Sequence, residues 1–159
     1  MTLQQKVKDA LAARAPFQSG EHLLEAEHAG QQFACELVTL DSLACATTRL
    51  ALRSDSLRSM SAEQLKAVAQ NLSARLTYLL EPISPIEVDA QGCTVQLRSQ
   101  PPHKSDEGTS YYELLVSRLG EISLRRYARQ PGGKRSVIAA HLTREVLLRL
   151  AADFAAVLA

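Results

Sequence analysis

Apolar residues recur along the chain at two spacings, and each spacing predicts a different kind of element. Residues 3–11, 61–80 and 143–158 place them three or four positions apart, so that they share one face of a helix. Ser61, with a glutamine three residues later, forms a capping box for the second of these helices, and Thr143 can cap the third. Prolines follow the first two stretches and end them. We therefore expect an N-terminal, a central and a C-terminal helix.

Between the predicted helices, apolar and polar residues alternate with the period of a β-strand that has one buried face. The alternating stretches are residues 31–40, 42–54, 86–99 and 111–125. Short turns join the strands in pairs, and we expect Gly92 to take the positive φ of one turn and Gly120 to form another. Residues 99–110 contain two prolines and mostly polar side chains, so a mobile loop is expected there.

Residues 19–30 fit two interpretations. Ser19 could cap a two-turn helix that Gly30 closes, or the stretch could be the first strand of a meander that turns at Ala29 and Gly30. We favour the strand, because the residues that follow clearly alternate.

The resulting order of elements is helix, two or three strands, helix, four strands and helix. Strands joined by short turns pair in antiparallel fashion, so this order predicts an α+β fold. We expect a largely antiparallel sheet of about six strands, covered on one face by the N-terminal, central and C-terminal helices in a two-layer sandwich. No repeat or break in composition divides the chain, so residues 1–159 are expected to form a single domain.

Composition narrows the class of protein. Of the 159 residues, 46% are hydrophobic and 22% are charged, which is typical of a globular domain. The three cysteines, Cys35, Cys45 and Cys93, are odd in number and lack CxxC spacing, so we interpret them as small buried residues in a reducing compartment. The N-terminus lacks the features of a signal peptide, and no stretch of roughly 18 apolar residues is present. A cytoplasmic protein without a membrane partner is therefore expected.

Basic charge gathers near the end of the chain, where residues 117–159 hold eight basic and three acidic side chains. Seven of the eight basic residues are arginines, whose planar guanidinium group suits carboxylate and phosphate ligands. The candidate anion-binding residues are Arg125, Arg129, Lys134 and Arg135. A phosphate-binding loop is excluded, because Ala128 and Arg135 stand where its motif requires glycine and serine or threonine. The alternative is a solvated sheet face on which the arginines pair with the chain's own carboxylates, such as Glu113.

No motif for catalysis, a cofactor or a metal is present in the sequence. The chain lacks both GxSxG and GxGxxG. Histidines and carboxylates crowd together only in residues 21–28, which do not form HExxH and are interpreted as an exposed polar edge. We therefore predict no catalytic residue, no metal ligand and no cofactor, and no motif identifies a family.

The outer face of the predicted sheet is only moderately polar. Tyr111 and Leu115 lie opposite the core residues of one strand, and Cys45, Thr47 and Arg49 lie opposite those of another. Because a half-apolar outer face suits an interface, the candidate interface residues are Tyr111, Leu115 and Arg49.

The leading hypothesis is a small non-enzymatic module that binds a protein partner or forms a homodimer. One alternative is binding of nucleic acid or a phosphorylated ligand through residues 125–135, and a second is an enzyme without a sequence signature. Nucleic acid is disfavoured, because the net charge is only +1 and aromatic residues make up 4% of the chain.

Overall fold

Three α-helices begin at polar N-cap residues in the computed structural model, which describes residues 1–159. They are α1 (Leu3–Ala12), α2 (Ala62–Arg75) and α3 (Arg144–Ala156), and a short 3-10 helix, η1 (Asp55–Ser59), precedes α2. The side chains of Thr2, Ser61 and Thr143 each accept a hydrogen bond from a backbone N–H three residues later. Each cap satisfies one of the backbone donors that a helix leaves free at its first turn. The three predicted helices are confirmed, and the central one is shorter than expected.

Ten strands form one sheet in which every pair is antiparallel. Their bounds are β1 (His22–His28), β2 (Gln31–Leu40), β3 (Ala44–Ser54), β4 (Ile83–Asp89), β5 (Thr94–Ser99), β6 (His103–Ser105), β7 (Gly108–Ser117), β8 (Glu121–Arg129), β9 (Arg135–Ile138) and β10 (Ala140–Thr143). Seven of them form a continuous path in the order β1-β2-β3-β8-β7-β5-β4. The α+β fold with an antiparallel sheet is confirmed, and residues 19–30 contain a strand rather than a helix.

Three short strands account for most of the excess over the predicted number. β6 pairs with β7, β9 pairs with β8, and β10 pairs with β3. Each has only three or four residues, too few for an alternating pattern to stand out in the sequence. The expectation of a loop over residues 99–110 was therefore wrong in part, because β6 and the start of β7 form a hairpin there.

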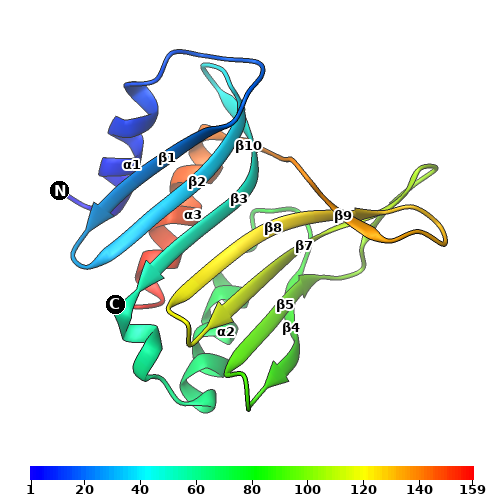
Figure 1. The fold of residues 1–159 in the computed structure, drawn as a ribbon. Coiled ribbons are helices and arrows are strands. Elements are labelled where there is room, and N and C mark those ends of the chain that lie inside the picture. Colours follow the sequence, from blue (N-terminus) through cyan, green and yellow to red (C-terminus); the bar gives the residue numbers. More distant parts are fainter.

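All three helices cover the same face of the sheet, and the other face is open (Figure 1). α1 and α3 pack against each other and against strands β1 to β3, whereas α2 packs on β4, β5 and β7. The core between the layers is built mostly from aliphatic side chains, and Phe33 and Phe154 are its largest fully buried members. Burial of this apolar area is the main source of the free energy that holds the two layers together.

The central helix ends earlier than the spacing of its leucines predicts. α2 ends at Arg75, and Leu80, which was expected on its apolar face, is 92% exposed and has a φ of 65°. Three residues after the end of the helix, the Tyr78 hydroxyl donates to Asp153 Oδ2 on α3 at 2.7 Å. Three residues later, Glu81 forms an ion pair with Arg126 of β8 at 3.0 Å. These two contacts tie the loop to α3 and to the sheet.

The turn between β4 and β5 also differs from the expectation. Cys93, not Gly92, has the positive φ, with a value of 49°. The Asp89 Oδ1 atom accepts a hydrogen bond from the Gly92 backbone N–H at 2.9 Å, which fixes the turn one residue later than predicted.

A register shift between β2 and β3 changes the face on which two residues lie. The pairing slips near Leu37, so that Thr47 and Cys45 point toward the helices. Both are 3% exposed, and the Thr47 hydroxyl donates to the Glu36 carbonyl at 2.7 Å and lies 3.2 Å from Cys35 Sγ. The expectation that Cys45 and Thr47 lie on the outer face was wrong, because strict alternation fails at a bulge.

We expect Cys35 and Cys45 to resist thiol reagents in the native protein. Burial raises the pKa of Cys35 to about 12 and the pKa of Cys45 to about 11, so the reactive thiolate is scarce at pH 8. In a Cys93→Ser variant, titration with Ellman's reagent at pH 8 should detect two thiols in urea and almost none without it. Rapid labelling of the folded variant would contradict the buried placement.

Candidate binding face

The open face of the sheet carries three rows of side chains that run across the strands. Cross-strand pairing gives the middle row as Glu25, Ala34, Ala51, Ser123, Leu115, Gln96 and Glu87. The five residues between the two glutamates of this row carry no charge, and three of them are alanine or serine. The rows on either side of it contain the arginines and the remaining carboxylates, so the centre of the face is a neutral strip between charged rows.

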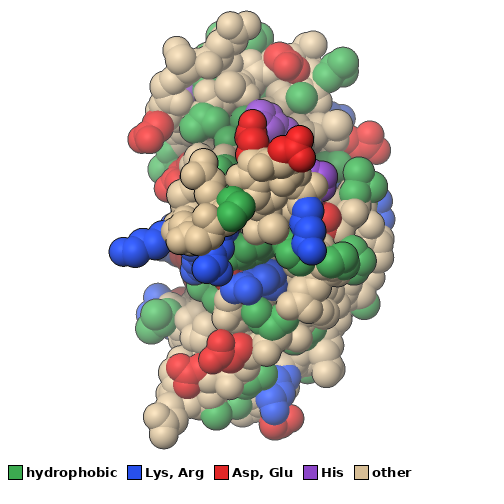
Figure 2. Space-filling model, turned by 90° about the vertical axis from the view of Figure 1, so that its right-hand side faces the viewer, with side chains coloured by type: hydrophobic (Ala, Val, Ile, Leu, Met, Phe, Trp, Pro, Cys, Tyr) green, Lys and Arg blue, Asp and Glu red, His purple; other side chains and the backbone are tan.

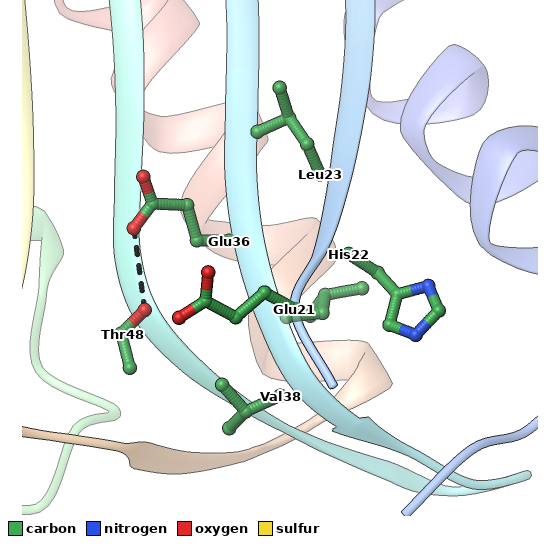
Figure 3. Close-up of a pocket in the computed structure, with 7 residues that line it drawn as sticks. Glu21, His22, Leu23, Glu36, Val38 and Thr48 are labelled. Atoms are coloured by element: carbon green, nitrogen blue, oxygen red, sulfur yellow. Dashed lines mark hydrogen bonds between the residues drawn. The ribbon is translucent and has the colours of Figure 1, made fainter. Parts of the chain in front are cut away.

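Strands β1 and β2 form the acidic part of this face. Residues 15–48 contain no lysine or arginine, and Glu21, Glu25, Glu27 and Glu36 are all exposed. Figure 3 shows Glu21 and Glu36 beside a concavity of about 320 Å³, where Thr48 Oγ1 donates to Glu36 Oε2 at 3.3 Å.

The histidine next to this acidic group points away from it. Figure 3 shows the His22 ring turned to the side of β1 opposite Glu21 and Glu36, and it stacks on Phe17 with ring centroids 3.7 Å apart. No group of three or more histidine, cysteine or acidic side chains is arranged to hold a metal ion. The histidines and carboxylates of residues 21–28 are therefore close together in the sequence, but the strand separates them onto two faces.

Strands β3 and β8 carry the basic part of the face. Glu121 accepts hydrogen bonds from both Arg49 and Arg53, the latter at 3.2 Å. Burial, followed by the charge of Arg125, lowers the pKa of Arg49. Arg125 is exposed and lies in no ion pair, so its positive charge remains available to a ligand or partner. Arg49, a candidate interface residue, lies on this face, and its side chain is 21% exposed.

Glu113 of β7 is a buried carboxylate that several cationic side chains share. Its residue is 5% exposed, and its Oε1 atom accepts hydrogen bonds from Gln96, from Arg98 at 3.2 Å and from Arg135 at 2.9 Å. The Tyr111 hydroxyl and Glu113 together raise the pKa of Arg135. A single carboxylate therefore holds together side chains from β5, β7 and β9.

Two tyrosines stack beneath the arginines of this network. The Arg98 guanidinium lies 4.5 Å from the centroid of the Tyr111 ring, and that of Arg135 lies 3.9 Å from the centroid of Tyr127. Tyr111 is only 8% exposed, so this candidate interface residue presents little of its ring to solvent, whereas Leu115 is 37% exposed. Sequence reasoning did not single out Arg98 or Tyr127, because their place depends on which strands pair.

The four candidate anion-binding residues lie in three different surroundings. Arg129 and Lys134 line one groove of about 610 Å³ between the β6–β7 and β8–β9 hairpins. Arg125 lies nearer the centre of the open face, and Arg135 is engaged with Glu113. Figure 2 views the molecule from the side of these hairpins and shows lysine and arginine side chains gathered across the middle of this flank.

A second groove, also of about 610 Å³, lies on the open face at the same end of the sheet. It is lined by Arg98, Gln100, Pro101, Pro102, Thr109, Tyr111 and Arg129. Arg129 thus borders both grooves, and its Nε atom donates to the Gly133 carbonyl at 2.9 Å. This contact fixes the base of the guanidinium group and leaves its two terminal nitrogens without a protein acceptor.

Comparison with protein-family models, with curated proteins and with solved structures found no significant match to this chain. None of the helices is both long enough and apolar enough to cross a lipid bilayer. The geometry and charge of the open face are the features that indicate a function.

Proposed function

We propose that this chain is a protein-binding module that pairs with a second copy of itself through the open face of its sheet. The separation of charge on that face carries the proposal: the charged residues that β1 and β2 present there are all glutamates, whereas β3 and β8 present Arg49, Arg53 and Arg125 with Glu121 as their one carboxylate. A two-fold axis along the boundary between β2 and β3 would lay the acidic strands of each copy over the basic strands of the other. Such an interface is self-complementary, as a symmetric dimer requires.

The neutral middle row supports close approach of two such faces. Ala34 and Ala51 pair across β2 and β3, at the proposed axis, and have no long side chains to hold a second sheet away. Leu23 is 48% exposed on β1 and supplies apolar area beside this strip. Sheets that pack face to face lie about 10 Å apart, which small side chains at the centre allow.

The two edges of the sheet are poorly suited to pairing with another chain, which favours the face. At the β1 edge, Lys6 Nζ of α1 donates to the Glu27 carbonyl at 2.8 Å and Arg14, just after α1, donates to the Leu23 carbonyl, so two of the free acceptors are covered. At the β4 edge, Pro85 lacks an N–H, and Glu87 and Asp89 would repel a second copy of the same strand. Both devices are known ways of preventing edge-to-edge association.

Charge reversal on either half of the face should weaken self-association, and mixing the two variants should restore it. Arg125→Glu cancels the net positive charge of the basic half, and Glu25→Arg removes most of the negative charge of the acidic half, so each homodimer gains a local repulsion at two symmetric positions. We expect each Kd to rise at least about tenfold, since 1.4 kcal/mol corresponds to that factor. In an equimolar mixture, opposite charges face each other again, and heterodimers should form. Sedimentation equilibrium at low salt, at micromolar concentration, measures all three states.

Lys8→Glu is the matched control, because Lys8 is exposed on α1 in the helix layer and away from the face. This variant should associate as the unchanged chain does. The proposal would be overturned if the wild-type protein were monomeric at low salt. It would also be overturned if the two variants remained monomeric when mixed.

A further inference from the structure

The groove between Arg98 and Arg129 has the chemistry of an oxyanion site. Arg98 and Arg129 line it together with Thr109 and Tyr111, and no acidic residue belongs to its lining. It lies over β5 and β7, on the side of β8 away from the strands that the proposed dimer would cover. The inference is therefore independent of the proposed self-association.

Both arginines have donors that the protein does not use. Arg98 places one terminal nitrogen 3.2 Å from Glu113 and its guanidinium over the Tyr111 ring, while its Nε atom is buried and makes no hydrogen bond. Arg129 uses only Nε, on the Gly133 carbonyl. A guanidinium group has five N–H donors, so several remain on each side chain.

The neighbouring acidic group cannot neutralise this end of the face. Glu113 is shared by Arg98 and Arg135, and it is the only carboxylate that forms an ion pair with an arginine of the groove. The groove also has fixed walls: Tyr111 is held by Arg98 and Arg135, and the Gln100 backbone N–H donates to the Pro82 carbonyl at 2.9 Å. Preformed donors around a positive concavity are what binding of an anion requires.

We infer that this groove binds the phosphate group of a small phosphorylated molecule, with Arg98 and Arg129 as the charged donors and Thr109 as a hydroxyl donor. A phosphate group has three strong acceptor oxygens and a charge of about −2, so it can accept hydrogen bonds from two guanidinium groups and a hydroxyl group at once. The volume of about 610 Å³ accommodates a ligand of small-metabolite size.

Titration of the full chain with inorganic phosphate, followed by amide chemical shifts, tests the inference. Ionic strength is held constant with sodium chloride, so that general screening does not change during the titration. We expect saturable shifts at Thr109, Tyr111 and Arg129. Arg129→Gln should weaken binding about tenfold or more, because it removes charge-assisted hydrogen bonds but no ion pair within the protein.

Arg118→Gln is the control of equal charge change, since Arg118 is exposed in the β7–β8 turn and lines neither groove. Its affinity for phosphate should stay within about twofold of that of the unchanged chain. Equal weakening by the two variants would show attraction to overall charge and would overturn the site. Shifts that do not saturate, or that lie away from Thr109 and Tyr111, would overturn it as well.

Discussion

Replacing Gly108 by alanine is expected to lower the free energy of unfolding by about 3 kcal/mol, because the glycine has a φ of 133° and faces backbone at very short range. A Cβ atom at this position would lie 2.2 Å from the Arg129 carbonyl oxygen and 3.0 Å from Gln130 Cα. Since both neighbours are backbone, relief requires β7 and β8 to move apart where Thr109 pairs with Arg129. Urea denaturation followed by circular dichroism measures the change.

Gly132 provides the matched control for that experiment. It also has a positive φ, 74°, but a Cβ atom there would meet nothing within 4 Å. Gly132→Ala should therefore cost only the backbone strain, about 1 kcal/mol. Similar losses in the two variants would contradict the close approach of Gly108 to β8.

The spacing of apolar residues was sufficient to place the helices, because each has a polar cap and a stripe several turns long. The spacing was insufficient where tertiary contacts determine the end of an element or the face on which a residue lies. Leu80 continues the spacing of α2, yet the helix ends at Arg75, and the loop after it is held by the bonds of Tyr78 to Asp153 and of Glu81 to Arg126. Likewise, the bulge near Thr47 reverses the expected face of two residues, since one extra residue shifts the whole alternation.

The ion pairs of the candidate site likewise could not be predicted from the spacing of residues. The sequence placed a cluster of arginines near residues 118–135, but which of them have partners depends on cross-strand register. Arg135 reaches Glu113 only because β9 folds back on β8, next to β7. Arg98 belongs to the same network although it lies 37 positions earlier in the chain, because β5 pairs with β7. Local spacing contains no information on such pairings.

Replacing Glu113 by glutamine should lower the free energy of unfolding by about 3 kcal/mol, because it removes the charge that two arginines share. The carboxylate side chain is 4% exposed, so water cannot take its place, whereas Arg98 and Arg135 are 31% and 42% exposed and can turn partly toward solvent. That partial exposure places the expected cost at the lower end for a buried pair. Glutamine keeps the size of the side chain, so the change in charge is separated from a change in packing.

Glu121, with its two arginines, is the control that shows whether burial of the carboxylate determines the loss in free energy of unfolding. Glu121 also binds two arginines, but its side chain is 22% exposed, and Glu121→Gln should cost about 1 kcal/mol. In a double-mutant cycle, Arg135→Gln combined with Glu113→Gln should cost less than the sum of the single changes, because both remove the same interaction. Additive losses would mean that Arg135 does not stabilise the buried carboxylate, and the Arg135 side chain would then contact the open face only through Tyr111 and Tyr127.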